Sequence, residues 1–186
     1  MKRFFDMSAS LVLLLVLIFP LIIIAIVVKI SSKGAILFWS DRIGRNNVVF
    51  NMPKFRTMKT STPNKATHLL EEPGSFITPF GQFLRRFSMD ELPQLFSIIK
   101  GDMSFVGPRP ALFNQEDLIK MRKIEKIDVL IPGLTGWAQV NGRDGLSIHE
   151  KVCLDKEYME NQSFWFDLKI ICNTLIKTIK NQDVSH

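Results

Sequence analysis

An uncharged stretch near the start of this chain limits what it can fold into more than any other feature. No charged side chain occurs from Met7 to Val28, and most of these residues are apolar. About 22 residues at 1.5 Å each form a helix about 33 Å long, enough to cross a hydrocarbon core of roughly 30 Å. Pro20 lies near the middle, where it removes a backbone hydrogen bond at a cost of roughly 3 kcal/mol. A sharp bend at Pro20 would leave each arm too short to cross alone.

The charges around this stretch favour the cytoplasmic side for both of its ends. Lys2 and Arg3 precede it, Lys29 and Lys33 follow it, and positive flanks remain cytoplasmic. This predicts a re-entrant helix. A single membrane-spanning anchor is equally open, because proline is tolerated in many such helices. A cleaved signal peptide is disfavoured, because the apolar stretch is too long and no small-residue cleavage site follows it.

Residues 163–182 predict an amphipathic helix near the other end of the chain. Its apolar side chains recur at helical spacing: Phe164, Leu168, Ile171, Leu175 and Ile179. Lysines fall mainly on the other faces. Two interpretations remain equally open, an interfacial helix on an anionic leaflet and an edge helix packed on the domain core.

Composition and cysteine spacing exclude several classes of protein. Without the apolar stretch the chain is an ordinary polar domain of roughly 150 residues. The net charge of +6 indicates an anionic partner: a nucleic acid, an acidic membrane or a phosphorylated substrate. Cys153, Cys172 and the three histidines do not have the spacing of a zinc site or a disulfide scaffold. Dinucleotide-binding and P-loop motifs are also absent from the sequence.

The polar part predicts a mostly helical α/β domain with short strands. Residues 35–40 and 47–52 are rich in β-formers around a turn-like IGRNN, so they predict a hairpin. The following elements are expected: a connection with at most a short helix over 59–81, a helix from near Asp90 to Lys100 ended by Gly101, a surface helix within 114–127, a strand and loop region over 131–147, and a helix over 149–161.

Two adjacent acids at the start of the predicted helix suggest phosphate chemistry. Asp90 and Glu91 are accompanied along the chain by basic residues: Lys54, Arg56, Arg85, Arg86 and Arg109. Guanidinium groups and helix N-terminal amides bind phosphate oxygens, and a carboxylate can attack phosphorus or hold a divalent cation. Adjacent helical residues point about 100° apart, so the two acids should play different roles.

A structural explanation competes with catalysis at these positions. Ser88 and Glu91 match the S-x-x-E capping box, and acids in a first helical turn stabilise it by roughly 0.3 to 1 kcal/mol. For Arg86, Arg122 and Arg143 the interpretation as solvated surface charges is favoured.

Several motifs together resemble the small monotopic phosphoglycosyl transferases of bacteria. They are KFRTM, DELPQLF, GDMSFVGPRP and PGLTGWAQVNGR, after a proline-broken hydrophobic segment. The resemblance covers almost the whole chain. It implies transfer of a sugar 1-phosphate from a UDP-sugar to undecaprenyl phosphate, with release of UMP, as the first membrane step of glycoconjugate synthesis.

The resemblance also implies roles for individual residues. Asp90 would be the nucleophile that forms an aspartyl phospho-sugar, with Mg²⁺ beside it, and Glu91 would assist. Lys54, Arg85 and Arg109 match phosphate-binding positions, and Arg56 and Arg143 are weaker matches. One departure is Phe19, because the family often has serine before Pro20.

Location and partners follow from the same resemblance. Residues 1–33 would form the re-entrant helix, and residues 34–186 the catalytic domain on the cytoplasmic face of the bacterial inner membrane. The implied partners are a UDP-sugar, undecaprenyl phosphate and membrane lipid, with no nucleic acid; a homodimer is left open. Two alternatives are a spanning anchor with the same chemistry and a non-enzymatic basic binding module anchored to the membrane.

Overall fold

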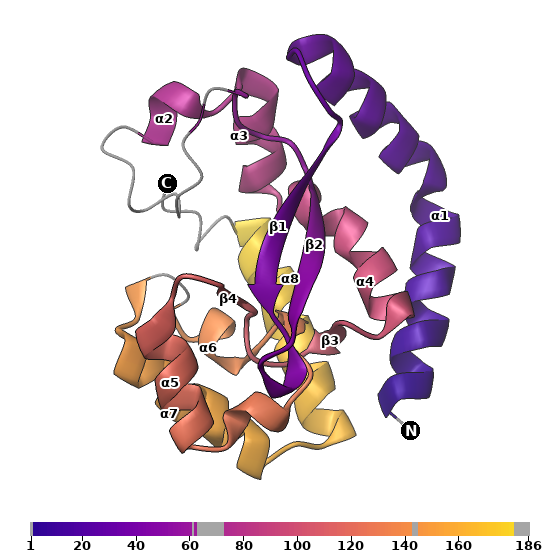
Figure 1. The fold of residues 1–186 in the computed structure, drawn as a ribbon. Coiled ribbons are helices and arrows are strands. Elements are labelled where there is room, and N and C mark those ends of the chain that lie inside the picture. Colours follow the sequence, from indigo (N-terminus) through magenta and orange to yellow (C-terminus); the bar gives the residue numbers. More distant parts are fainter. Residues whose placement is uncertain (1, 61, 63–72, 143–144, 181–186) are drawn as a thin grey trace.

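The apolar stretch forms one long helix. The structure, a computed structural model, describes residues 2–60, 62, 73–142 and 145–180. Helix α1 (Lys2–Ser31) is continuous across Pro20 and bows along one side of the remaining elements (Figure 1). It is long and apolar enough to cross a membrane. The expected break at Pro20 is not seen, because Pro20 lies inside one uninterrupted helix.

One stripe of α1 faces the domain along its whole length. The stripe contains Asp6, Ser10, Leu14, Leu17, Leu21, Ile24 and Val28. Their spacing of three and four residues keeps them on a single helical face. The outward faces expose large apolar side chains, among them Leu15, Val16 and Phe19. A surface of this kind needs apolar surroundings, which is consistent with a membrane-anchoring helix.

The predicted hairpin is confirmed. Strands β1 (Leu37–Ile43) and β2 (Val49–Phe55) pair antiparallel, with Ile43 opposite Val49 beside the turn. The turn contains the short 3₁₀ helix η1 (Arg45–Asn47), where Asn46 adopts a positive φ that asparagine tolerates well. Strand β4 (Ala111–Leu112) adds to the other edge of β1.

A second, parallel pair joins β3 (Ser104–Val106) to β5 (Gly133–Thr135). Gly133 allows β5 to approach the backbone of Gly107, just after β3, because a Cβ atom at position 133 would lie 2.1 Å from the Gly107 nitrogen. This contact fixes the turn that leaves β3.

Helices surround the hairpin on both sides. They are α2 (Pro73–Phe76), α3 (Pro79–Arg86), η3 (Met89–Gln94), α4 (Leu95–Lys100), α5 (Glu116–Ile124), η4 (Ile127–Val129), α6 (Trp137–Val140), α7 (Ile148–Glu160) and α8 (Phe164–Lys180). Helix α4 lies between the hairpin and α1, whereas α5, α6 and α7 lie on the other side of the hairpin (Figure 1). Hairpin residues Phe50 and Met52 share a core cluster with Leu95 and Ile98 of α4.

The predicted helix over residues 90–100 differs at its start. Residues 89–94 form the 3₁₀ helix η3, and the α-helix begins only at Leu95; Gly101 ends it in the left-handed region as predicted. The capping box is wrong. Ser88 adopts φ 53° and makes no side-chain cap hydrogen bond, and the Glu91 carboxylate pairs with Lys54 instead. The Glu91 carboxylate binds Lys54 in a largely buried ion pair and does not cap the start of the helix.

The amphipathic C-terminal helix is confirmed, but the face that packs on the core is shifted from the predicted stripe. Ile170 is fully buried and Asp167 nearly so, while Phe164 and Leu175 of the predicted stripe are about half exposed. Trp165 is the most exposed of these side chains. The packing of one face on the core confirms the edge-helix interpretation, while the position of α8 on an anionic leaflet stays a prediction.

Candidate active site

An ion cluster at the end of the hairpin brings together residues from three separate segments. The Nζ atom of Lys54, on β2, lies 2.7 Å from Oε1 of Glu91, on η3. The Nη2 atom of Arg109, in the turn after β3, lies 3.2 Å from the same oxygen. One carboxylate oxygen therefore positions two basic groups, both partly buried, at the same point.

The backbone explains why these side chains meet. Strand β2 packs against η3 along much of its length. Lys54 lies opposite Phe38 in the hairpin register, near the end of β2. Pro93 is the fifth residue of η3 and precedes α4, which begins at Leu95, so it does not interrupt the interior of an α-helix. Asp90 and Glu91 are both only 8% exposed.

Asp90 is the most unusual group of the cluster. Within the described part of the chain its carboxylate accepts no hydrogen bond from another side chain or backbone amide. Burial raises the pKa of Asp90 above its ordinary value, and the neighbouring charge of Glu91 raises it further. Lys54, Arg85 and Arg109 act in the opposite direction and favour the ionised form. A buried carboxylate that lies among cations and accepts no hydrogen bond from the described residues is suited to attack an electrophile.

Arg85 reaches the cluster from α3. The helix begins at Thr78, whose Oγ1 accepts a hydrogen bond from the Gly81 backbone, and Pro79 occupies its first turn. Gly81 is needed because a Cβ atom would lie 2.2 Å from the Thr57 carbonyl oxygen. This docking allows Arg85 Nε to donate to Thr57 Oγ1 at 2.9 Å. Burial lowers the pKa values of both Arg85 and Lys54.

Arg109 is presented by a turn between two prolines. Pro108 and Pro110 have no backbone N–H, so this turn is fixed mainly through its carbonyl oxygens. Gly133 N donates to Pro108 O at 2.9 Å, and Arg42 Nη1 donates to Pro110 O at 3.2 Å. The rigid turn directs the Arg109 side chain toward Glu91.

Arg56, another predicted phosphate-binding residue, does not join the cluster. Arg56 is buried and donates through Nη2 to the carbonyl oxygen and hydroxyl of Ser32, each at 2.8 Å, just beyond the end of α1. Arg143 lies outside the described residues.

Arg122 is not the solvated surface charge that its sequence context favoured. Its side chain is 12% exposed and pairs with Asp155, which is 2% exposed. A signal was available, because Arg122 lies four residues after buried Leu118 on α5. Asp155 likewise lies three residues from both Val152 and Tyr158 on α7, and these two are buried. Opposite charges on the apolar stripes of two helices predict a buried ion pair.

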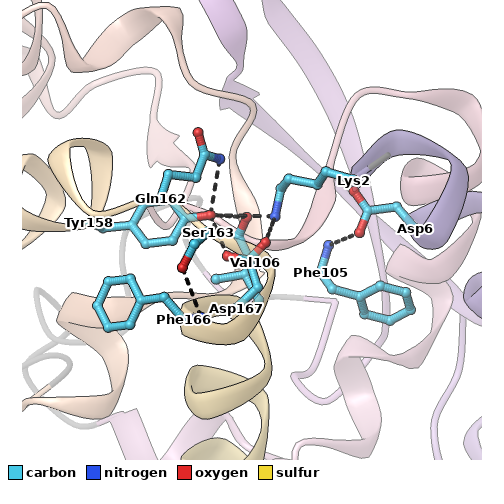
Figure 2. Close-up of polar contacts among 9 residues, drawn as sticks. All are labelled: Lys2, Asp6, Phe105, Val106, Tyr158, Gln162, Ser163, Phe166 and Asp167. Carbon is cyan, nitrogen blue, oxygen red and sulfur yellow. Dashed lines mark hydrogen bonds and ion pairs between the residues drawn. The ribbon is translucent and has the colours of Figure 1, made fainter.

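A polar network connects the start of α1 with α8 (Figure 2). Lys2 Nζ lies 2.5 Å from Asp167 Oδ2, and the Tyr158 hydroxyl lies 2.8 Å from Asp167 Oδ1. Burial raises the pKa of Tyr158 and keeps its hydroxyl neutral. The Phe105 amide donates to Asp6 Oδ1 at 3.4 Å, which brings β3 into the same arrangement. No local pattern predicts contacts between residues so far apart in sequence.

The Mg²⁺ expected beside Asp90 stays a prediction. In the ranges that the structure describes, no three histidine, cysteine, aspartate or glutamate side chains gather to hold a metal. Mg²⁺ commonly binds through one or two carboxylates, with water and substrate phosphates as its other ligands. The Asp90 carboxylate fits that pattern.

Comparison with known proteins places this site in a family context. Residues 1–181 match the family model described as bacterial sugar transferase. The sugar transferase EpsL of Bacillus subtilis is 37% identical, over 99% of this chain and 90% of its own length. The UDP-glucose:undecaprenyl-phosphate glucose-1-phosphate transferase of Escherichia coli is 35% identical, over 98% of this chain and 41% of its own length. An undecaprenyl-phosphate N-acetylgalactosaminephosphotransferase of Aeromonas hydrophila is 33% identical, over 96% of this chain and 43% of its own length. The chain therefore belongs to the bacterial sugar transferase family.

Proposed function

We propose that this chain transfers a sugar 1-phosphate from a UDP-sugar to undecaprenyl phosphate through a covalent intermediate on Asp90, with release of UMP. Its family makes it a phosphoglycosyl transferase, because relatives similar over nearly all of this chain are named for that reaction. The non-enzymatic binding module is therefore set aside. The chain spans about two-fifths of the Escherichia coli and Aeromonas hydrophila proteins, so the reaction is assigned here to their shared part.

The observation that carries this proposal is the environment of Asp90. Its carboxylate is buried beside three cationic side chains and accepts no hydrogen bond from the described residues. A diphosphate brings negative charge that Lys54, Arg85 and Arg109 can neutralise, and phosphoryl transfer depends chiefly on positioning and charge stabilisation.

The proposed chemistry has two balanced steps. In the first, an Asp90 oxygen attacks the phosphorus that bears the sugar; a bond from this oxygen to phosphorus forms, the bridging P–O bond breaks, and UMP leaves with that electron pair. In the second, a phosphate oxygen of undecaprenyl phosphate attacks the same phosphorus. The aspartyl bond breaks, the carboxylate is regenerated, and the product is an undecaprenyl diphosphosugar.

The other residues serve these steps by binding and orientation. Glu91 holds Lys54 and Arg109 on one carboxylate oxygen, so it positions the groups that receive the phosphates. Asp90, together with donor phosphate oxygens, would hold Mg²⁺. When bound, the cation supplies further neutralisation of the charge on the diphosphate.

We also infer that the chain is monotopic and lies on the cytoplasmic face of the inner membrane. The first turn of α1 is held to the domain through Lys2 and Arg3, and the segment after the helix is held through Ser32. A helix whose two ends contact the same domain is more readily placed as re-entrant than as spanning. Its basic flanks and a water-soluble nucleotide donor favour the cytoplasmic side.

The test is UMP release from a panel of UDP-sugars with Mg²⁺ and undecaprenyl phosphate. The panel is needed because the relatives are named for different sugars. Wild type should release UMP with one or a few donors, and Asp90→Asn should release none. Asp102→Asn is the matched control, because Asp102 pairs with the exposed Lys100 at the end of α4, and it should retain wild-type rates. Release by Asp90→Asn at the wild-type rate would overturn the proposal.

A further inference from the structure

A buried ion pair outside the cluster holds the backbone of Arg109. Arg122 Nε and Nη2 lie 3.0 and 2.6 Å from Oδ2 of Asp155, so the guanidinium engages this carboxylate through two of its nitrogens. Its third nitrogen, Nη1, donates to the carbonyl oxygen of Arg109 at 2.8 Å. Arg122 comes from α5 and Asp155 from α7.

The geometry points to Arg122 and Asp155 as positioning residues for the phosphate-binding Arg109. This inference rests on the proposed function, because it assigns the pair to the phosphate contact made by Arg109. Neither residue of the pair is placed at the reacting atoms.

The turn that contains Arg109 has few backbone hydrogen-bond donors. The two prolines next to Arg109 cannot donate hydrogen bonds, so the turn is fixed through its carbonyl oxygens. Pro108 O is held by the Gly133 backbone, Pro110 O by Arg42, and Arg109 O by Arg122. Of these three holding groups, Arg122 is the one bonded to the residue whose side chain reaches Glu91.

The orientation of Arg122 depends in turn on Asp155. An arginine has a long, flexible side chain, and a carboxylate that accepts from two of its nitrogens fixes the plane of the guanidinium. With that plane fixed, Nη1 points at the Arg109 carbonyl. A lysine could not make both contacts, because its ammonium is a single point charge.

A role in overall stability alone is the competing explanation. Buried ion pairs can often be replaced by apolar residues of similar volume without loss of stability, whereas removing one partner leaves a buried charge. The pair should therefore be replaced as a unit, by Arg122→Met with Asp155→Leu. An apolar pair can restore packing between α5 and α7 but cannot donate to the Arg109 carbonyl.

Three readouts separate positioning from stability. We expect the paired replacement to keep a melting temperature close to wild type while the rate of UMP release falls about 10- to 100-fold, as for losses of outer-shell support or small misplacements. UMP binding should weaken along with the rate. In an Arg109→Met background, the same replacement should change the rate by less than about threefold, because the group that it positions is gone.

A matched control exists on the same two helices. Lys156 and Glu125 form an exposed ion pair between α7 and the end of α5, with the two atoms 2.6 Å apart. Lys156→Gln with Glu125→Gln should leave UMP binding and release unchanged. If the paired apolar replacement does not fold, Arg122→Lys provides the comparison against this control, because it keeps the charge opposite Asp155 but cannot make both contacts.

The outcomes are distinguishable. A paired replacement that folds, releases UMP and binds it like wild type overturns the positioning role. So does an equal fall in rate whether the replacement is made in the wild-type chain or in the Arg109→Met background, because independent effects combine additively in free energy. Failure of the proposed function has a different signature, because the wild-type chain itself would then release no UMP from any donor.

Discussion

Asp90 is placed where it costs stability, which is typical of a residue retained for chemistry. Its folded-state pKa is raised, so the folded chain binds a proton at Asp90 more readily than the unfolded chain does. Protonated Asp90 therefore contributes stability to the folded chain at low pH, and this contribution is lost as the pH rises through the folded-state pKa of Asp90. Ionised Asp90 destabilises the fold at neutral pH.

Asp90→Asn should accordingly lose activity and gain stability. We expect UMP release to fall by about 10⁴-fold or more, as for loss of a nucleophile. The melting temperature at pH 7 should rise, by about 2 to 4 °C for each kcal/mol of relieved destabilisation in a chain of this size. Activity assays and thermal unfolding in detergent test both parts. A lower melting temperature than wild type would contradict the assigned cost of burial.

Neighbouring charges should shift the pH dependence of the first half-reaction in opposite directions. Glu91 raises the pKa of Asp90 and Lys54 lowers it. The acid limb of the rate of UMP release should therefore move to lower pH in Glu91→Gln and to higher pH in Lys54→Met. Single-turnover rates measured across the acidic range test this. A shift of both variants in the same direction would show that the acid limb does not report Asp90.

Sequence reasoning identifies the residues of the cluster better than it identifies their supports. The positions Lys54, Arg85, Asp90, Glu91 and Arg109 form local motifs, and the structure places them together. Their phosphate-binding and catalytic roles remain predictions. The apolar stripes of α5 and α7 indicate that Arg122 and Asp155 are buried, but the two lie 33 residues apart on different helices and the local sequence does not show that they pair. Pairings across such distances depend on how helices pack, which a single sequence does not specify.

Among the elements, α1 is tied to the helix that follows the two acids. Arg3 donates to the carbonyl oxygens of Ile98 and, at 2.7 Å, Ile99 in the last turn of α4. These carbonyls have no partner within the helix, and a cation there is favourable to the helix dipole. Helix α1 thus caps the helix that continues from η3.

Loss of this cap should weaken α4 and, through it, the cluster. For Arg3→Ala we expect a stability loss of roughly 1 kcal/mol, or about 2 to 4 °C in melting temperature, together with slower UMP release. Lys33→Ala is the control, because it removes one positive charge just after α1 from an exposed side chain. Equal effects of the two substitutions would assign the loss to membrane charge and not to capping.

The elements that were predicted well are those with strong local patterns. The hairpin alternates β-formers around a turn, and it forms with the expected pairing. The conformation of residues 89–94 is harder to predict. Their sequence matches a capping box, but in the folded chain Glu91 pairs with Lys54 of β2. The stripe of α8 was misplaced for a similar reason, since Asp167 is buried by its contacts with Lys2 and Tyr158.

The arrangement of the whole molecule predicts a topology. Both ends of α1 contact one domain, so both should lie on the cytoplasmic side. A variant with Cys153→Ser and Cys172→Ser, carrying one cysteine either before Met1 or in place of Lys33, tests this by labelling with an impermeant maleimide. Neither cysteine should react in intact spheroplasts, and both should react after lysis. Labelling before Met1 in intact spheroplasts would establish a spanning helix.

The central claim is the covalent bond between Asp90 and the phospho-sugar. The most direct measurement is the intact mass of the purified chain after incubation with its UDP-sugar donor and Mg²⁺ in the absence of undecaprenyl phosphate. We predict an added mass equal to one sugar phosphate, located on the peptide containing Asp90, removed by adding acceptor and absent in Asp90→Asn. UMP release that strictly requires acceptor, with no added mass on the wild-type chain, would contradict the account.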